Sequence, residues 1–182
     1  MKKKIALVII DAQNDFVYDA LRNEDAIKAL PTVKKALEYA REHNFERVFT
    51  RDTHDDNYLK TQEGKNLPVP HCIYGTDGWD VCDEVWPHDD EEYVIDKSSF
   101  GTLDFPDFEY LEVDEIWMCG FCTDICVSAN FQILKAMYPD IPIVVISDAC
   151  AGVTPAKHEA ALEVMRSCQA KVVTFDELMK GE

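Results

Sequence analysis

The fold is decided by Lys4-Ile5-Ala6-Leu7-Val8-Ile9-Ile10-Asp11, a run of six apolar residues that ends at a carboxylate. Nearly continuous apolar runs of this length are typical of strands that are buried on both faces. Strands of that kind occur in parallel sheets, where helices cover both sides. The run therefore predicts a central strand of a parallel sheet, with Asp11 at its carboxyl end.

Further strands and helices alternate along the rest of the chain. Val33, Leu37 and Ala40 recur at helical spacing, and Pro31 suits the first turn of that helix. We predict five more strands, at residues 47–50, 93–95, 115–119, 141–146 and 171–174, and helices at residues 31–43, 124–137 and 155–168, with a short helix after Thr174. This alternation predicts an α/β fold, with a mostly parallel six-stranded sheet and helices on both faces in a Rossmann-like three-layer arrangement.

The composition excludes several classes of function. The length of 182 residues fits a single domain over residues 1–182. The net charge of −17 argues against nucleic acid or an anionic membrane surface as a partner. The seven cysteines are odd in number and several lie in apolar stretches, which favours reduced thiols. Because the first apolar run is short and has no cleavage site after it, we expect a cytoplasmic protein.

Polar residues follow several of the predicted strands. In open parallel sheets, ligands bind beyond the carboxyl ends of the strands. Asp11, Asp52, Lys97, Asp148 and the segment 120–126 all fall there. If these residues meet at one edge of the sheet, reactive side chains from distant parts of the chain would lie close together.

Cys126 lies just after the fourth strand, in the predicted first turn of a helix that Thr123 or Asp124 could cap. A helix N-terminus stabilises a thiolate, so Cys126 is a candidate nucleophile. A small apolar residue packed under the sheet is the plainer interpretation. Asp11 beside it could act as a general base, and Lys97 near Asp11 would hold that carboxylate ionised.

The long segment after the second strand carries metal-ligand types. Asp52 and His54 are two residues apart, and Glu63 and His71 follow downstream. Carboxylate and imidazole groups together suit a divalent transition metal. Exposed acidic loops also contain such residues by chance, so the spacing leaves metal binding open.

Three stretches resemble the isochorismatase-like cysteine hydrolases, especially their nicotinamidase branch. They are Asp11-Ala12-Gln13-Asn14-Asp15-Phe16, Asp96-Lys97-Ser98-Ser99-Phe100 and Gly120-Phe121-Cys122-Thr123-Asp124-Ile125-Cys126-Val127. The resemblance extends over residues 9–153 and implies an isochorismatase-like fold. It implies that Asp11 is the acid/base, that Lys97 is the catalytic lysine and that Cys126 attacks the substrate.

The resemblance also implies further features of the site. It places a cis peptide between Phe121 and Cys122, and an oxyanion hole at the backbone N–H groups of Cys122 and Cys126. Phe16 and Phe121 are expected in the substrate pocket. One divalent ion, Zn²⁺ with Mn²⁺ or Fe²⁺ as alternatives, is expected on Asp52, His54, Glu63 and His71. Relatives often form homo-oligomers.

The expected activity is hydrolysis of the C–N bond of a small-molecule amide through a thioester, with nicotinamide as the leading substrate. Two departures from the family pattern weaken the assignment of nicotinamide as the substrate. Lys60 stands where many members have a histidine ligand, and Pro68 stands where nicotinamidases have an aromatic residue that stacks on the ring. A metal-free amidase or N-carbamoyl hydrolase of the same family is the first alternative. A non-catalytic binding or assembly protein is the second.

Overall fold

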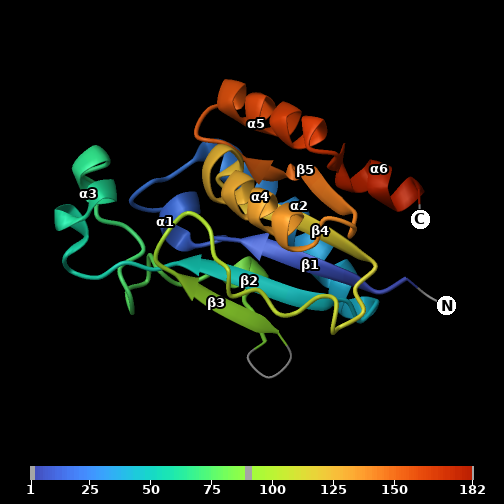
Figure 1. Cartoon of the computed structure of the whole chain (residues 1–182). Helices are drawn as coiled ribbons and strands as arrows, with labels where there is room; N and C mark the ends of the chain where they lie inside the picture. Colours follow the sequence, from blue (N-terminus) through green and yellow to red (C-terminus); the bar gives the residue numbers. More distant parts are fainter. Residues whose placement is uncertain (1–2, 89–91, 182) are drawn as a thin grey trace.

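The computed structural model describes residues 3–88 and 92–181, and its centre is a six-stranded sheet. The strands lie in the order β3-β2-β1-β4-β5-β6, and all five neighbouring pairs are parallel (Figure 1). Their bounds are β1 Ile5–Ile10, β2 Glu46–Asp52, β3 Tyr93–Lys97, β4 Glu115–Phe121, β5 Ile143–Ala151 and β6 Lys171–Val173. The predicted α/β fold class, with its parallel sheet, is confirmed.

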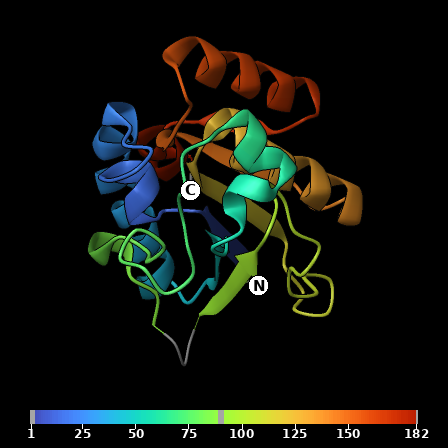
Figure 2. The ribbon, with the colours of Figure 1, turned by 90° about the vertical axis from the view of Figure 1, so that its left-hand side faces the viewer.

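Helices cover both faces of the sheet. The longer ones are α2 Glu24–Glu42, α4 Ser128–Met137 and α5 Pro155–Ser167, and Figure 2 shows α2 on one side of the sheet and α4 on the other. The short helices are α1 Asn14–Val17, η1 Tyr58–Lys60, α3 Gln62–Asn66, η2 Asp83–Val85 and α6 Phe175–Lys180, together with the π-helical turn η3 Thr123–Val127. In the described part of the chain, no helix combines the length and apolar character that crossing a membrane requires.

The strand register brings distant residues to one edge of the sheet. Ile10 is level with Thr50 on one side and Gly120 on the other, so β1 ends beside both neighbours. Asp52 is paired with Lys97 at the ends of β2 and β3. The arrowheads of these strands point to the side of the molecule where α3 lies (Figure 1). The order of the strands reverses between β1 and β4, which is where ligands bind in such sheets.

β1 is the innermost strand, and all six of its residues are buried. Its neighbour β4 is also buried along its whole length. Gly120 has a φ of +117°, and a Cβ there would collide with the carbonyl oxygen of Ile10. The close approach of β1 and β4 therefore requires a glycine at this position.

Two predicted boundaries were wrong by five residues or more. α2 begins at Glu24 rather than at Pro31, because the side chain of Asn23 accepts hydrogen bonds from the backbone N–H groups of Asp25 and Ala26. Pro31 therefore lies inside the helix. β5 continues to Ala151, with a register shift opposite β4 between Met118 and Gly120.

Candidate active site

Asp11, Lys97 and Cys126 meet at the carboxyl edge of the sheet. Lys97 Nζ lies 2.7 Å from Oδ2 of Asp11 and 3.7 Å from Sγ of Cys126. All three residues are buried, with exposed fractions of 0%, 3% and 4% respectively. A carboxylate, an ammonium and a thiol are thus held together away from bulk water, an arrangement that can move a proton and activate a nucleophile.

The local backbone explains how each side chain arrives there. Asp11 has a φ of +48°, which turns the chain out of the sheet directly after β1. Lys97 is the last residue of β3, and Cys126 lies in the turn that follows β4. The peptide between Phe121 and Cys122 is cis, as the resemblance implies.

The turn that carries Cys126 differs from the predicted helix start. Val127 N–H donates to the carbonyl of Cys122 five residues earlier, which is the π-helical pattern. Neither predicted cap is formed. Thr123 Oγ1 lies 2.8 Å from Nδ1 of His158, and Asp124 accepts the N–H of Val153. Both side chains bind elements that the sequence pattern does not place nearby.

Electrostatics keep the proton on the sulfur of Cys126 in the free protein. Burial and the charge of Asp11 raise the pKa of the Cys126 thiol well above its ordinary value, and Lys97 offsets only part of this. The position of Cys126 at the start of this turn therefore does not outweigh the effect of burial on the pKa of its thiol. Burial also raises the pKa of Asp11, although Lys97 opposes the shift. Burial alone would lower the pKa of Lys97, but Asp11, Cys126 and Asp52 raise it, so Lys97 stays protonated.

Thr50 is a further residue at this site that sequence patterns did not single out. Its hydroxyl donates a 2.6 Å hydrogen bond to Oδ1 of Asp11, while Lys97 takes Oδ2. Thr50 is 1% exposed. The signal that could have identified it is the level pairing of Ile10 with Thr50, which no sequence pattern supplies.

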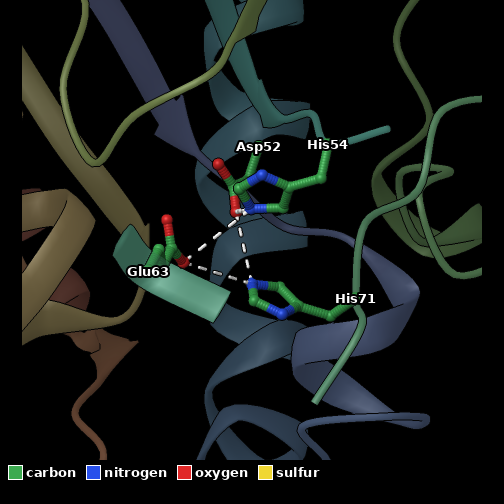
Figure 3. A group of neighbouring side chains, drawn as sticks. All are labelled: Asp52, His54, Glu63 and His71. Atoms are coloured by element: carbon green, nitrogen blue, oxygen red, sulfur yellow. Dashed lines mark hydrogen bonds and ion pairs between the residues drawn. The ribbon is translucent and has the colours of Figure 1, made fainter. Parts of the chain in front are cut away.

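A second group of side chains converges beside the first (Figure 3). Asp52 and His54 come from the end of β2, Glu63 comes from α3, and His71 comes from the loop that follows. One ligand atom from each residue lies within 4.8 Å of the others. The shortest of these contacts joins Nε2 of His54 to Oδ2 of Asp52 at 2.9 Å.

The chemistry of these donors fits a divalent metal ion. Nδ1 of His71 lies 2.9 Å from the carbonyl of Val69, and a carbonyl oxygen can only accept a hydrogen bond. Nδ1 must therefore carry a proton, and in the neutral ring, the form that binds a metal, the lone pair is on Nε2 and faces Asp52 and Glu63. Two imidazoles and two carboxylates are a donor set that binds Zn²⁺ and similar ions. Lys60 lies outside this group and hydrogen-bonds Asn57.

The charged groups of this cluster shift one another's pKa values. Burial alone would raise the pKa of Asp52, but hydrogen bonds with His54 and His71, with the charge of Lys97, hold it well below its ordinary value. Burial and the charge of Asp52 raise the pKa of Glu63. Nζ of Lys97 lies 3.3 Å from Oδ1 of Asp52, so this one ammonium touches both groups of residues.

One cavity of about 1090 Å³ connects the two groups, and Cys126, Asp52 and Phe16 all line it. Phe121 does not line it: this side chain is 0% exposed and lies in the core, because β4 is buried to its last residue. Leu67 lines the cavity, whereas the adjacent Pro68 is exposed and does not. Asp148 lies on the irregular part of β5 and accepts the N–H of Phe175, so it does not belong to the site.

Comparison with known proteins identifies the family to which the chain belongs. The family model described as the isochorismatase domain matches residues 5–177. The chain is 29% identical over 184 residues to the nicotinamidase/pyrazinamidase of Mycobacterium tuberculosis, covering 92% of this chain and 97% of that protein. It is similar to the pyrazinamidase of Pyrococcus horikoshii, solved in complex with zinc, with a TM-score of 0.79 and 28% identity over 94% of this chain and 99% of that one. N-carbamoylsarcosine amidase from Thermoplasma acidophilum gives a TM-score of 0.77 and 25% identity, covering 94% and 96% of the two chains.

Proposed function

The chain belongs to the isochorismatase family, and from that premise we propose that it is a cysteine hydrolase that cleaves the C–N bond of a small amide. The observation that carries the proposal is the buried contact of Lys97 Nζ with both Asp11 and the sulfur of Cys126. A lysine that served only the fold would gain nothing from lying against a thiol at the floor of a cavity. We assign Cys126 as the nucleophile and Asp11 as the proton carrier.

The first step is attack by sulfur. Asp11 accepts the proton from the Cys126 thiol as the C–S bond forms at the amide carbonyl. The raised pKa of Asp11 makes it a stronger base than an exposed carboxylate, and the fixed charge of Lys97 stabilises the negative charge that develops on sulfur. No free thiolate needs to persist, which agrees with the raised pKa of the thiol.

The tetrahedral intermediate carries a negative oxygen. The backbone N–H groups of Cys122 and Cys126 are the donors we assign to it, and one lost donor typically costs about 3 kcal/mol. Asp11 then returns its proton to the nitrogen, the C–N bond breaks, and ammonia or an amine leaves. Water, deprotonated by Asp11, attacks the resulting thioester. The C–S bond breaks, the carboxylic acid leaves, and the sulfur regains its proton.

Asp52, His54, Glu63 and His71 would hold a divalent ion, and zinc is our first assignment because a similar structure contains it. A bound ion supplies a coordination point for a ring nitrogen or a water, which orients the substrate. The four side chains themselves close one wall of the cavity. Lys97 shields the charge of Asp52 from that of Asp11.

Nicotinamide is the leading substrate, since the similar proteins include a nicotinamidase/pyrazinamidase. Phe16 supplies one aromatic surface for its ring. Pro68, exposed and outside the cavity, supplies none, and this favours the alternative of another amide or an N-carbamoyl compound. The similar N-carbamoylsarcosine amidase supports the same alternative. A cytoplasmic location and assembly into homo-oligomers stay predictions.

The test is an ammonia-release assay over nicotinamide, pyrazinamide and N-carbamoyl compounds, with and without added Zn²⁺, Mn²⁺ or Fe²⁺. Cys126→Ala should abolish turnover of whichever substrate the parent protein hydrolyses. Cys168→Ala, at the half-buried end of α5, is the matched control and should keep full activity. Ammonia release that survives in Cys126→Ala would rule out the cysteine mechanism. A parent protein inactive on every compound would favour the binding-protein alternative.

A further inference from the structure

We infer that Gln13 and Asp15 are positioning residues that hold the metal-binding side chains in place before an ion arrives. The inference rests on the proposed metal site. Both residues belong to the stretch that carries Asp11, yet neither has a role in the proposed chemistry. Both side chains are buried, with exposed fractions of 0% for Gln13 and 7% for Asp15. Each forms hydrogen bonds to the backbone of a segment that carries metal ligands.

The side chain of Gln13 forms hydrogen bonds with both the C=O and the N–H of Asp52. Its Nε2 donates to the carbonyl of Asp52 at 2.9 Å, and its Oε1 accepts the N–H of Asp52 at 2.7 Å. A second donor bond from Nε2, at 2.7 Å, reaches the carbonyl of Trp79. A primary amide is the one side-chain group with both a donor and an acceptor at the spacing of a peptide.

The reason for this contact lies in the sheet. The register that pairs Ile10 with Thr50 would pair residue 12 with Asp52 if β1 continued. β1 does not continue, because Asp11 turns the chain away with its φ of +48°. The side chain of Gln13 takes the hydrogen bonds that the missing strand would have made. Without it, the buried N–H and C=O of Asp52 would lose these partners.

Asp15 holds the other histidine segment. Its Oδ2 accepts the N–H of Cys72, the residue after His71, at 2.6 Å, and its Oδ1 accepts the N–H of Ala20 at 3.1 Å. Cys72 has a φ of +47°, and its carbonyl accepts the N–H of His54 at 2.9 Å. The backbone of Cys72 is therefore fixed to Asp15 on one side and to His54 on the other. This sets the separation of the two imidazoles.

These contacts place the ligands in advance of binding. His71 lies in a loop outside the main sheet, so the hydrogen bond from the next residue, Cys72, to Asp15 helps to fix the position from which its ring extends. Outer partners of metal ligands typically change metal affinity by about 10–100-fold when they are removed. The alternating residues Asp11, Gln13 and Asp15 thus serve both halves of the site, one as proton carrier and two as supports for the metal group.

The experiment measures the zinc dissociation constant by competition with a chromophoric chelator, on full-length folded protein. Asp15→Asn and Gln13→Met should each raise this constant by about 10–100-fold. Asn14→Ala is the matched control and should leave zinc affinity unchanged, because the Asn14 side chain donates its hydrogen bond to the carbonyl of Asp77 and not to a segment that carries a metal ligand. Excess zinc should restore ammonia release in Asp15→Asn, whereas it should not restore Cys126→Ala.

The outcomes separate this inference from the proposed function. Suppose that the parent binds zinc and that both variants bind it equally well, with only their melting temperatures lowered. Gln13 and Asp15 then stabilise the fold without affecting the metal site, so this inference fails while the proposed function stands. If the parent binds none of Zn²⁺, Mn²⁺ and Fe²⁺, the metal assignment fails and this inference fails with it, whatever the hydrolase assay shows. Should the variants not fold, amide hydrogen exchange of the zinc-free parent decides. Slow exchange at Asp52 and Cys72 supports preformed ligand segments, and rapid exchange at both overturns them.

Discussion

Thr50 has no reactive group of its own in this site, yet its hydroxyl fixes the direction in which Asp11 presents its carboxylate. The 2.6 Å hydrogen bond occupies Oδ1, and the ion pair with Lys97 occupies Oδ2. A hydrogen bond to a charged group contributes about 1.5–3 kcal/mol. Its loss would let the carboxylate rotate away from the position that the proposed proton exchange with Cys126 requires.

We therefore predict that Thr50→Val lowers kcat by about 10–100-fold. KM should change little, because Thr50 does not line the cavity. Thr50→Ser should recover most of the lost rate, since it restores the hydroxyl. Steady-state kinetics with the best substrate of the parent would check this. A rise in KM at constant kcat would show that Thr50 acts on binding rather than on Asp11.

Individual residues were predictable to the extent that their chemistry shows in the chain. A carboxylate, a lysine and a cysteine that follow apolar runs can be recognised without a structure, and the strand register explains why these three lie together. Thr50, Gln13 and Asp15 could not be recognised in this way. They act through contacts with residues 39 or 57 positions away, and only the folded chain brings those partners together.

At the scale of elements, most helices and strands were predictable because apolar spacing reports which face is buried. The boundaries of these elements were less predictable, because they depend on particular hydrogen bonds. Asn23 caps the start of α2 about two turns before Pro31, and a π-helical turn rather than a capped α-helix leads into α4. The fifth strand runs past Ser147 and Asp148, because the irregular pairing with β4 keeps the polar pair inside the strand.

α6 offers a test of one such hydrogen bond. Thr174 accepts the N–H of Glu177, and the Glu177 carboxylate accepts the N–H of Thr174, which together form a capping box. Thr174→Ala should cost about 1 kcal/mol, equivalent to a fall of about 2–4 °C in Tm for a chain of this size. Activity should stay unchanged, because α6 contributes nothing to the cavity. Thr174→Ser should keep the parent Tm, and an unaltered Tm in Thr174→Ala would show that α6 does not need its cap.

For the molecule as a whole, the site is a consequence of strand order. β1 and β4 are neighbours although more than a hundred residues separate them, and the order of strands reverses between them. Asp11 follows one of these strands and Cys126 the other, so the reversal itself opens the place for the substrate. The sequence predicted that strands and helices alternate. It did not predict the order β3-β2-β1-β4-β5-β6, because apolar runs carry no record of which strand lies beside which.

Glu92 forms ion pairs with both α2 and β2, and these contacts predict how the stability of the fold depends on pH. Its side chain is 0% exposed and binds Arg41 of α2 at 2.9 Å and Arg47 of β2 at 3.0 Å. Burial would raise its pKa, but the hydrogen bonds from Arg41 and from the N–H of His88, together with both positive charges, hold the pKa below the ordinary value of 4.5. The folded state therefore prefers the ionised carboxylate more than the unfolded state does. This contribution to stability is complete above about pH 4.5 and is lost as the pH falls through the lower pKa of the folded state.

Glu92→Gln should unfold at lower urea concentration than the parent at pH 7, because the neutral amide cannot offset the charges of two half-buried guanidinium groups. The difference in unfolding free energy between parent and variant should narrow as the pH falls below 4.5, since protonation then removes the same charge from the parent. Urea titrations at intervals between pH 7 and the lowest pH at which the parent stays folded would measure it. Lys28→Gln, on the exposed face of α2, is the control for general charge effects. A difference that stays constant over this range would show that Glu92 stabilises the fold by packing and neutral hydrogen bonds, and that its charge has no part in holding α2 against the sheet.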